Sequence, residues 1–450
     1  MKANYHKKLS SWYRKFQIGK SPQMNLVWGF LLYTLVGFVL LSIPLFHKID
    51  ISLMDNLFIS TSAISTTGLA TIDLFESYNF MGQLVILSLV QLGGIGYMTL
   101  TTYFLLFTTK KITHWHNKVL GTEFALPKNI IINDFIKSVI VFTAVMEALG
   151  AILFYIAFTN TGMEGFKAVW FSIFHSISAF CTAGFSLFPD GFESYHDNVF
   201  INLIICILSV AGSIGFIVIT DIWYRITGRT KETTFTTKII VYGFLILLFL
   251  GTMLIYTSES TSLLGTNHTI LTSFFQAMSA MTTVGFNTIH IGNFSLPILL
   301  FVIFLMYIGA SPSGTAGGMK ITTLTAMIAI VKSRLLAQKK ITFLNRIIPF
   351  ERIYVATSTF ILYTSLIFLF SFLLAYTDDF TFIQILFEVA SALGTVGLST
   401  GITADLSVLG KAMIIILMFI GRVGVLTFGF ALLRQKQKES LKIRHDDLAV

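Results

Sequence analysis

One sequence pattern occurs four times in this chain of 450 residues, and it restricts the possible folds more than any other feature. Each copy reads Phe, three residues, Ser-Ala, two residues, Thr, any residue, Gly, and then Leu or Phe. The copies begin at Phe58, Phe174, Phe275 and Phe387, and each lies between two long apolar segments. Because recurrence over such distances marks repeated structural units, the fold must offer four equivalent positions.

The composition indicates a membrane protein that crosses the bilayer several times. Hydrophobic residues make up 54% of the chain and charged residues 12%, against roughly 25% charged residues in an ordinary soluble domain. Apolar runs of membrane-spanning length recur, among them residues 24–45, 135–158, 239–256 and 353–376. The first run is longer than a signal-peptide core and no small-residue cleavage site follows it, so we expect no removed signal.

The distribution of positive charge predicts the orientation in the membrane. Of the 31 Lys and Arg residues, we expect three outside (Lys48, Lys167 and Lys411) and two at membrane depth (Lys320 and Arg422). The others fall in the N-terminal tail, the loops between repeats and the C-terminal tail, which predicts cytoplasmic termini by the positive-inside rule. The net charge of +9 therefore favours contact with anionic membrane lipid, and we expect no nucleic-acid partner.

We predict an all-α integral membrane fold of four repeats around one pore, each made of a spanning helix, a short re-entrant helix and a second spanning helix. The short helices, such as residues 54–65 and 382–394, cannot cross a bilayer core. The predicted divisions are a cytoplasmic N-terminal tail at 1–22, repeats at 23–118, 130–230, 235–345 and 350–434, and a cytoplasmic C-terminal tail at 435–450.

The Thr-x-Gly turn after each short helix predicts one quarter of a cation filter. Non-helical backbone survives at membrane depth only where it is buried or lines water, and its carbonyl oxygens can replace the hydration shell of a cation. A lone turn of this kind is usually a glycine C-cap, but four matched copies favour a filter. The predicted cation-binding residues are Thr66, Thr67, Gly68, Thr182, Ala183, Gly184, Thr283, Val284, Gly285, Thr395, Val396 and Gly397.

Acidic residues near the expected outer mouth would raise the local concentration of cations there. They include Asp73, Glu76, Asp190, Glu193, Asp378 and Asp379.

A second repeated element, rich in small residues, follows each turn inside the closing helix. It begins at Gly93, Gly212, Gly309 and Gly421, and close packing of helices through small residues is one explanation for it. In repeat 3 it continues with a proline and several glycines, which cannot sustain a helix, so we expect a loop at membrane depth below the filter. We predict that this loop is a gate formed by Gly309, Ser311, Pro312, Ser313, Gly314, Thr315, Gly317, Gly318 and Lys320.

Two charged side chains within apolar segments allow more than one interpretation. Arg422 either faces the pore, where its charge would oppose cation transit and add to the gate, or extends to the cytoplasmic interface. Lys320 either stays with the loop or reaches the cytoplasm. Glu147, in the first helix of repeat 2, is either a proton or sodium relay residue or a hydrogen-bonded link between helices.

These motifs together resemble the Trk/Ktr/HKT superfamily of potassium transporters, and most of all the bacterial Ktr membrane subunit. The resemblance rests on the four Phe-to-Gly repeats, the interruption at 309–320 and the run Phe419-Ile-Gly-Arg-Val-Gly424, and it covers residues 25–433. It implies a single pore in pseudo-fourfold symmetry, with a gating loop at 309–320 and a pore-facing Arg422. Some sodium-carrying plant relatives have serine in the first filter, so Gly68 favours potassium.

The resemblance also implies partners. Family members form a homodimer that binds a cytosolic octameric ring of regulatory subunits, and ATP or ADP is expected on that ring only. No cofactor is expected on this chain, which would lie in the bacterial cell membrane with K⁺ as its permeant ion. Related systems are stimulated by sodium, and the sequence leaves open whether this one is.

Other classes of protein fit the sequence less well. The segment Gly397-Leu-Ser-Thr-Gly401 matches the G-x-S-x-G motif of hydrolases, but that motif requires an α/β sheet, so we predict that the chain is not an enzyme. The nine His residues show no metal-ligand spacing. The main alternative is an alternating-access secondary cation symporter, which would show two halves of inverted orientation instead of four parallel repeats.

Overall fold

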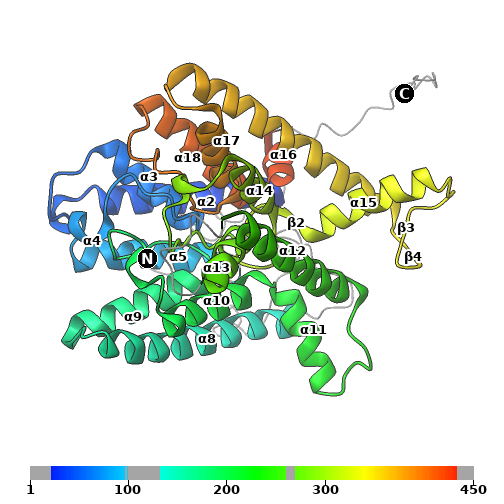
Figure 1. Cartoon of the computed structure of the whole chain (residues 1–450), viewed down its shortest axis with the longest axis horizontal. Coiled ribbons are helices and arrows are strands. Elements are labelled where there is room, and N and C mark those ends of the chain that lie inside the picture. The colour runs from blue at the N-terminus through cyan, green and yellow to red at the C-terminus, as the bar shows by residue number, and fades with distance from the viewer. Residues whose placement is uncertain (1–21, 97–98, 100–131, 260–268, 433–450) are drawn as a thin grey trace, which may run out of the picture.

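The structure, a computed structural model, describes residues 22–96, 99, 132–259 and 269–432. Its regular elements are helices apart from two sheets of two strands each. Figure 1 shows the helices of repeats 1 to 4 following one another around the centre of the view, from blue through green to orange. The prediction of an all-α fold is confirmed.

Each repeat opens with a long apolar helix. The four are α2 (Pro22–Leu41), α8 (Ile132–Asn160), α12 (Phe235–Glu259) and α16 (Phe350–Thr377). They contain 20, 29, 25 and 28 residues, and about 20 residues suffice to cross a bilayer core at 1.5 Å per residue. Large apolar side chains on them face outward, such as Leu32 and Phe372, which are 59% and 70% exposed. These helices therefore present apolar surface suited to lipid.

A short helix follows in each repeat. The four are α3 (Leu53–Ile64), α9 (Gly165–Phe180), α13 (Thr269–Thr282) and α17 (Phe382–Gly394), with 12, 16, 14 and 13 residues. Side-chain caps fix two of their starts: the Ser52 hydroxyl accepts the amide of Asp55, and Thr381 forms a capping box with Gln384. Their last turns are fully buried, so each short helix runs inward from an exposed start.

The closing helix is interrupted in repeats 2 and 4 as well as in repeat 3, although the sequence predicted an interruption in repeat 3 alone. In repeat 1, α5 (Phe80–Ile95) ends at Gly96; in repeats 2 and 4, α10 (Val199–Ser213) and α18 (Val408–Val423) bend into α11 (Phe216–Ile226) and α19 (Val425–Leu432). The two bends measure 88° and 99°. Gly96, Gly215 and Gly424 adopt φ of 85°, 92° and 91°, a conformation open mainly to glycine, and this explains why each break falls there.

In repeat 3 the break is a whole segment. The helix α14 (Leu296–Tyr307) ends before strand β1 (Ile308–Gly309), and strand β2 (Met319–Lys320) precedes α15 (Ile321–Leu335). The two strands pair in parallel, so residues 310–318 form a closed loop between them. The predicted loop of repeat 3 is therefore present as a non-helical segment.

Small residues also let the closing helices pack closely, as the sequence suggested. A Cβ atom on Gly93, Gly212 or Gly421 would overlap the carbonyl oxygen of Ile64, Phe180 or Leu393, respectively. Each of these carbonyls lies in the last turn of the short helix of the same repeat. The first glycine of the element thus places the closing helix against the short helix, and the last glycine bends it.

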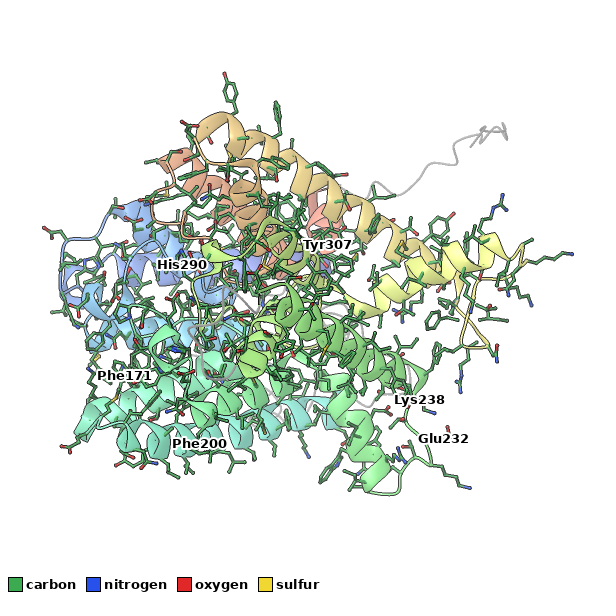
Figure 2. The ribbon with its side chains drawn as sticks, in the orientation of Figure 1. Phe171, Phe200, Glu232, Lys238, His290 and Tyr307 are labelled. Carbon is green, nitrogen blue, oxygen red and sulfur yellow. The ribbon has the colours of Figure 1, made fainter. Side chains whose placement is uncertain are left out.

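The remaining elements connect the helices. They are η1 (Pro44–Phe46), α4 (Leu74–Ser77), η2 (Glu193–Tyr195), η3 (Ile291–Asn293) and the antiparallel strands β3 (Thr342–Phe343) and β4 (Arg346–Ile347). The β3–β4 hairpin and the end of α15 project on the right of Figure 1. Figure 2 shows the Glu232–Lys238 ion pair toward that side, away from Phe171 and His290.

The contacts between repeats close a ring. Each closing helix contacts the short helix of the next repeat: α5 contacts α9, α10 contacts α13, α14 contacts α17, and α18 returns to contact α3. An ion pair of 2.9 Å between Lys411 of α18 and Asp55 of α3 lies at this last junction. The first and last repeats are thus neighbours in space although they are far apart in the sequence.

Candidate functional site

The four Thr-x-Gly turns share one backbone conformation. Thr66, Thr182, Thr283 and Thr395 have φ between 48° and 56°, and the glycines that follow two residues later have φ between 66° and 92°. A threonine is rarely found at positive φ, because its branched side chain then crowds the backbone. Four such threonines at equivalent positions indicate that the surroundings impose this conformation on each turn.

The Ser-Ala part of the pattern explains how each turn is held. The amides of Thr67, Ala183, Val284 and Val396 donate to the carbonyl of the motif serine of the same repeat, at 2.9, 2.8, 3.2 and 2.8 Å. The serine hydroxyl makes a second bond to the turn. In repeats 1 and 4 it accepts the amide of Gly68 or Gly397, at 3.1 Å in both, and in repeats 2 and 3 it donates to the carbonyl of Phe185 or Phe286, at 2.8 and 2.6 Å.

The four turns meet in a closed ring. A Cβ atom on the glycine of any repeat would overlap the carbonyl oxygen of the middle turn residue in the next repeat: Gly68 faces Ala183, Gly184 faces Val284, Gly285 faces Val396, and Gly397 faces Thr67. Glycine is required at all four places, both for its positive φ and for this close approach. The structure thus brings together all twelve residues that the sequence predicted for the filter.

The short helices add to the electrostatics of this ring. Each ends directly before its turn, so the negative ends of four helix dipoles meet there. Among the described residues, no group of three His, Cys, Asp or Glu side chains could hold a metal ion. The carbonyl oxygens of Thr67, Ala183, Val284 and Val396, which face the turn glycines, are oxygen donors within the ring.

The loop of repeat 3 contacts the turns through hydrogen bonds. The Thr182 hydroxyl donates to that of Thr315 at 3.1 Å, and the Gly317 amide donates to the Thr283 hydroxyl at 3.0 Å. The hydroxyls of Thr66 and Thr395 have no hydrogen-bond partner among the described residues. Two of the four turn threonines thus bind the loop: Thr182 of repeat 2 and Thr283 of repeat 3.

Other loop residues bind the broken helix of repeat 2. The Thr315 amide donates to the Gly212 carbonyl at 3.1 Å, and the Phe216 amide donates to the Ser313 carbonyl, also at 3.1 Å. A Cβ atom on Gly317 would overlap the carbonyl of Gly394 in repeat 4. The loop is consequently packed against three repeats at the inner ends of their turns.

Arg422 connects the loop to repeat 1. Its guanidinium donates to the Thr315 carbonyl at 2.5 Å, and also to the carbonyls of Gly93 and Gly94 on α5. Of the two positions that the sequence left open, the structure has the side chain bound to the loop and not extended to an interface. Charge-assisted hydrogen bonds of this kind are stronger than neutral ones, so Arg422 is a firm link between the loop and its surroundings.

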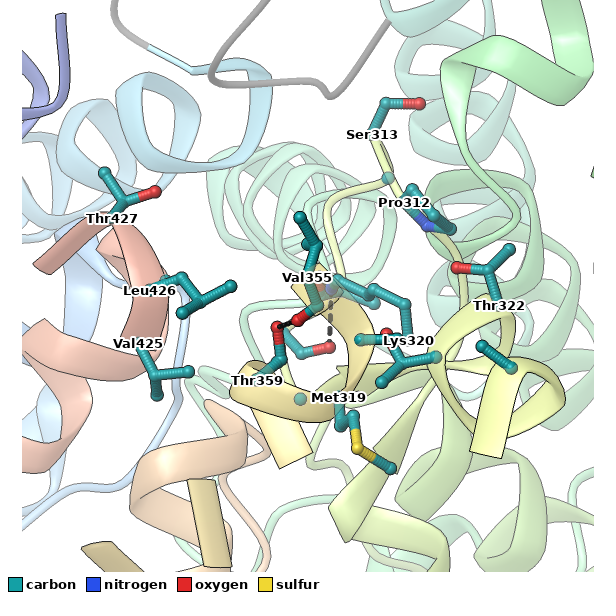
Figure 3. Close-up of a pocket in the computed structure, with 18 of the residues that line it drawn as sticks. Pro312, Ser313, Met319, Lys320, Thr322, Val355, Thr359, Val425, Leu426 and Thr427 are labelled. Atoms are coloured by element: carbon teal, nitrogen blue, oxygen red, sulfur yellow. Dashed lines mark hydrogen bonds between the residues drawn. The ribbon is translucent and has the colours of Figure 1, made fainter. Parts of the chain in front are cut away.

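Lys320 binds the loop from within. Its ammonium group donates to the carbonyls of Ala316 and Gly317 at 2.6 and 2.7 Å. Three successive loop carbonyls, from Thr315 to Gly317, therefore accept hydrogen bonds from protein cations. A cavity of about 610 Å³ lies beside these residues and is lined by both Lys320 and Arg422 (Figure 3).

Glu147 lies at a junction of repeats 1 and 2. Its carboxylate accepts a hydrogen bond of 3.1 Å from Gln91 of α5 and lies 3.7 Å from the Cys181 sulfur beside the second turn. This arrangement agrees with the interpretation of Glu147 as a hydrogen-bonded link between helices. Cys181 and Cys206 are both free thiols.

Several of the acidic residues that the sequence predicted near the outer mouth have structural partners. Asp378 accepts the Ser407 amide at 2.6 Å at the start of α18, and Asp73 caps α4 through the Glu76 amide at 2.7 Å. Glu193 accepts a hydrogen bond of 2.7 Å from Asn287. These carboxylates fix the connecting segments in addition to contributing negative charge on that side.

Three polar residues behind the turns were not predicted from the sequence. His175, Gln276 and Glu388 each follow the motif Phe, and each is at most 1% exposed. A comparison of the four copies position by position would have found them, because a polar residue recurs there within an otherwise apolar face. Their contacts are described below.

Four apolar helices of membrane-spanning length define an integral membrane protein, and its four turns form a closed ring of backbone groups. The profile of the TrkH family, described as cation transport protein, matches residues 32–445, and the chain belongs to this family. It is accordingly a transport protein and not an enzyme, as the sequence predicted.

Individual relatives are similar over almost their whole length. The Ktr system potassium uptake protein B of Bacillus subtilis is 34% identical over 95% of this chain and 96% of its own. The protein of the same name from Vibrio alginolyticus is 31% identical over 92% of both chains. The potassium/sodium uptake protein NtpJ of Enterococcus hirae is 32% identical over 96% and 97%. The crystal structure of the potassium transporter TrkH from Vibrio parahaemolyticus has a similar fold, with a TM-score of 0.72 and 20% identity over 92% and 86%.

Proposed function

We propose that this protein is the ion-translocating membrane subunit of a potassium uptake system in a bacterial cell membrane. K⁺ passes through the ring of four Thr-x-Gly turns, down the membrane potential, and the ring carbonyls replace its hydration shell. The observation that carries the proposal is the closed ring itself, in which each turn glycine faces a carbonyl of the next repeat. The relatives from Bacillus and Vibrio are named potassium uptake proteins and the one from Enterococcus a potassium/sodium uptake protein, and these names support K⁺ as the permeant ion.

The architecture that we propose has eight transmembrane helices and four re-entrant pore helices in pseudo-fourfold arrangement around one pore. The cyclic contacts from α5 to α9 and onward to α3 support it, because they join neighbouring repeats in the same way around a closed circuit. The interrupted closing helices then count as single spans, each bent at a glycine. In this arrangement the four turns are the filter, and both chain termini lie in the cytoplasm.

We further propose that residues 309–320 and Arg422 form a gate. The loop contacts the inner ends of the turns in repeats 2, 3 and 4, and Arg422 extends its contacts to repeat 1. Loop and side chain together therefore reach every repeat around the pathway. A positive charge at this place also opposes the transit of cations.

Partners complete the proposal. The relatives named as Ktr system proteins support assembly with regulatory subunits, and we propose a homodimer of this chain with a cytosolic octameric ring that binds ATP or ADP. Nucleotide-driven movement of the octameric regulatory ring would then act on the gate from the cytoplasmic side.

The proposal is tested by ⁸⁶Rb⁺ uptake into liposomes that contain the purified chain, with K⁺ or Na⁺ as competitor. We expect saturable uptake that K⁺ inhibits at far lower concentration than Na⁺. After removal of residues 311–318, we expect the same preference for K⁺ both with and without the regulatory subunits. Inhibition by both ions at the same concentration would contradict a potassium filter. Movement of a second ion together with ⁸⁶Rb⁺ in a fixed ratio would instead indicate an alternating-access symporter.

The contacts of the loop predict that the turn threonines differ in their effect on gating. In Thr283→Ala the Gly317 amide loses its acceptor. We therefore expect uptake in the absence of the regulatory subunits to rise about two- to tenfold, the range for the loss of one hydrogen bond. Thr66→Ala is the matched control, because Thr66 occupies the same place in its turn but does not bind the loop. Equal effects of the two substitutions would contradict a gate held by repeats 2 and 3.

A further inference from the structure

On the short helices of repeats 2, 3 and 4, one position faces the exit segment, which is the stretch of chain directly after the turn glycine. This position follows the motif Phe and holds Ile59, His175, Gln276 and Glu388 in repeats 1 to 4. All four side chains are at most 1% exposed. A buried polar group is costly unless it is hydrogen-bonded, so the partners of the three polar residues show what each one does.

In repeat 4, Glu388 binds the exit segment at two places. The Ser399 hydroxyl donates to one carboxylate oxygen at 2.8 Å, and the Thr403 hydroxyl donates to the other. Ser399 lies two residues after Gly397, accepts the Gly401 amide at 2.9 Å and binds Thr403 at 3.0 Å. A network of hydroxyl and carboxylate groups thus ties the outer end of this turn to α17.

In repeat 2, His175 has the same role with different chemistry. Its Nε2 accepts the Leu187 amide at 3.2 Å and lies 3.2 Å from the Ser186 hydroxyl, two residues after Gly184. Its Nδ1 lies 2.7 Å from the Phe171 carbonyl and therefore carries the hydrogen of a neutral ring. The ring also stacks on Phe188, with centroids 5.0 Å apart, so the exit segment is fixed by packing as well.

In repeat 3, the amide of Gln276 donates to the Thr288 hydroxyl at 3.0 Å. Thr288 lies three residues after Gly285 and is itself buried. Repeat 1 is different, since Ile59 offers no hydrogen bond at the shared position. There the link lies three residues earlier on the helix, where the Tyr78 hydroxyl donates to Asn56 at 2.7 Å, and Tyr78 lies ten residues beyond Gly68.

We propose that Glu388, Gln276 and His175 are positioning residues for the filter. Each fixes the exit segment of its repeat relative to the short helix of that repeat. It thereby fixes the turn carbonyls that discriminate K⁺ from Na⁺. Ion discrimination by carbonyls depends on their number and on how closely their positions are held. The proposal deepens the function proposed above and rests on it.

The three links differ in strength. Glu388 has two hydroxyl partners and His175 combines a backbone amide with aromatic stacking, whereas Gln276 makes one hydrogen bond. Hydrogen bonds to a carboxylate are the stronger kind. We therefore infer that selectivity depends most on Glu388.

The test uses the full chain in liposomes and measures the ratio of the Na⁺ and K⁺ concentrations that halve ⁸⁶Rb⁺ uptake. Glu388→Leu removes both hydrogen bonds, and we expect the ratio to fall about tenfold while uptake persists. Glu388→Gln keeps an acceptor and a donor of the same shape, so we expect a ratio close to that of the unsubstituted chain. If Glu388→Leu does not fold, Ser399→Ala removes one partner alone and should lower the ratio by a smaller factor.

A matched control separates positioning from general stability. Gln384→Leu lies one turn earlier on the same helix and removes a hydrogen bond within the capping box, not one to the exit segment. We expect it to lower the thermal unfolding temperature without changing the ratio. An unchanged ratio in Glu388→Leu, or an equal loss in Glu388→Gln, would overturn the proposal, the second result assigning the effect to charge. Lack of K⁺ preference in the unsubstituted chain would instead contradict the proposed function.

Discussion

Replacing Gly285 with serine is expected to reduce the preference for K⁺ over Na⁺ at least about tenfold, a factor that about 1.4 kcal/mol of differential ion binding produces. Two features of the site make the effect large. Gly285 has φ of 79°, and its missing Cβ leaves room for the Val396 carbonyl of the next repeat. A side chain there would strain its own turn and displace a neighbouring carbonyl at the same time.

The measurement is the competition of K⁺ and Na⁺ against ⁸⁶Rb⁺ uptake, with Gly162→Ser as the matched control. Gly162 also has positive φ, 90°, but no atom lies within 4 Å of the place where its Cβ would be. The control therefore introduces comparable backbone strain far from any filter carbonyl and should keep the preference. Clear uptake with an unaltered preference in Gly285→Ser would contradict the assignment of the ring as a filter.

Replacing Arg422 with glutamine should raise uptake without the regulatory ring about tenfold or more. The guanidinium donates to the Thr315 carbonyl of the loop and to the Gly93 carbonyl of α5. Hydrogen bonds from a charged group contribute about 1.5–3 kcal/mol each, so the loss of two would favour release of the loop. Uptake is measured in liposomes at equal protein density, with and without a membrane potential.

Arg422→Lys distinguishes the two ways in which this residue can oppose transit. Lysine keeps the positive charge but cannot donate in two fixed directions to carbonyls of different repeats. If the link to the loop matters, both variants will conduct more; if the charge alone matters, lysine will behave like arginine. No rise in either variant would contradict a role of Arg422 in gating.

Much of the fold follows from local patterns in the sequence. Apolar length predicted the four first helices to within a few residues; for example, residues 353–376 were expected where α16 runs Phe350–Thr377. The Thr-x-Gly pattern identified all of the residues that form the ring, because a turn at membrane depth imposes the same demands on each copy. The contacts of the motif serine were not foreseen, since a spacing does not show whether a hydroxyl binds an amide or a carbonyl.

The breaks in the closing helices show where local reasoning fails. A proline and several glycines predicted the loop of repeat 3. Gly96, Gly215 and Gly424, in contrast, could not be told from glycines that only allow close helix packing. A single glycine costs a helix only about 1 kcal/mol, so its presence does not predict a bend. The bends depend on neighbouring repeats, for instance on the Ser313 carbonyl that accepts the Phe216 amide after Gly215.

By itself, the sequence determined the membrane class, the four repeats and the residues of the ring, because apolar length and repeated turn chemistry are local properties. Tertiary structure alone decided that the ring closes from Gly397 back to Thr67, that Arg422 binds the loop and α5, and that Glu388 holds an exit segment. These are contacts between residues far apart in the chain or on opposite sides of a turn. Their geometry depends on how four repeats pack around one axis, which no single repeat specifies.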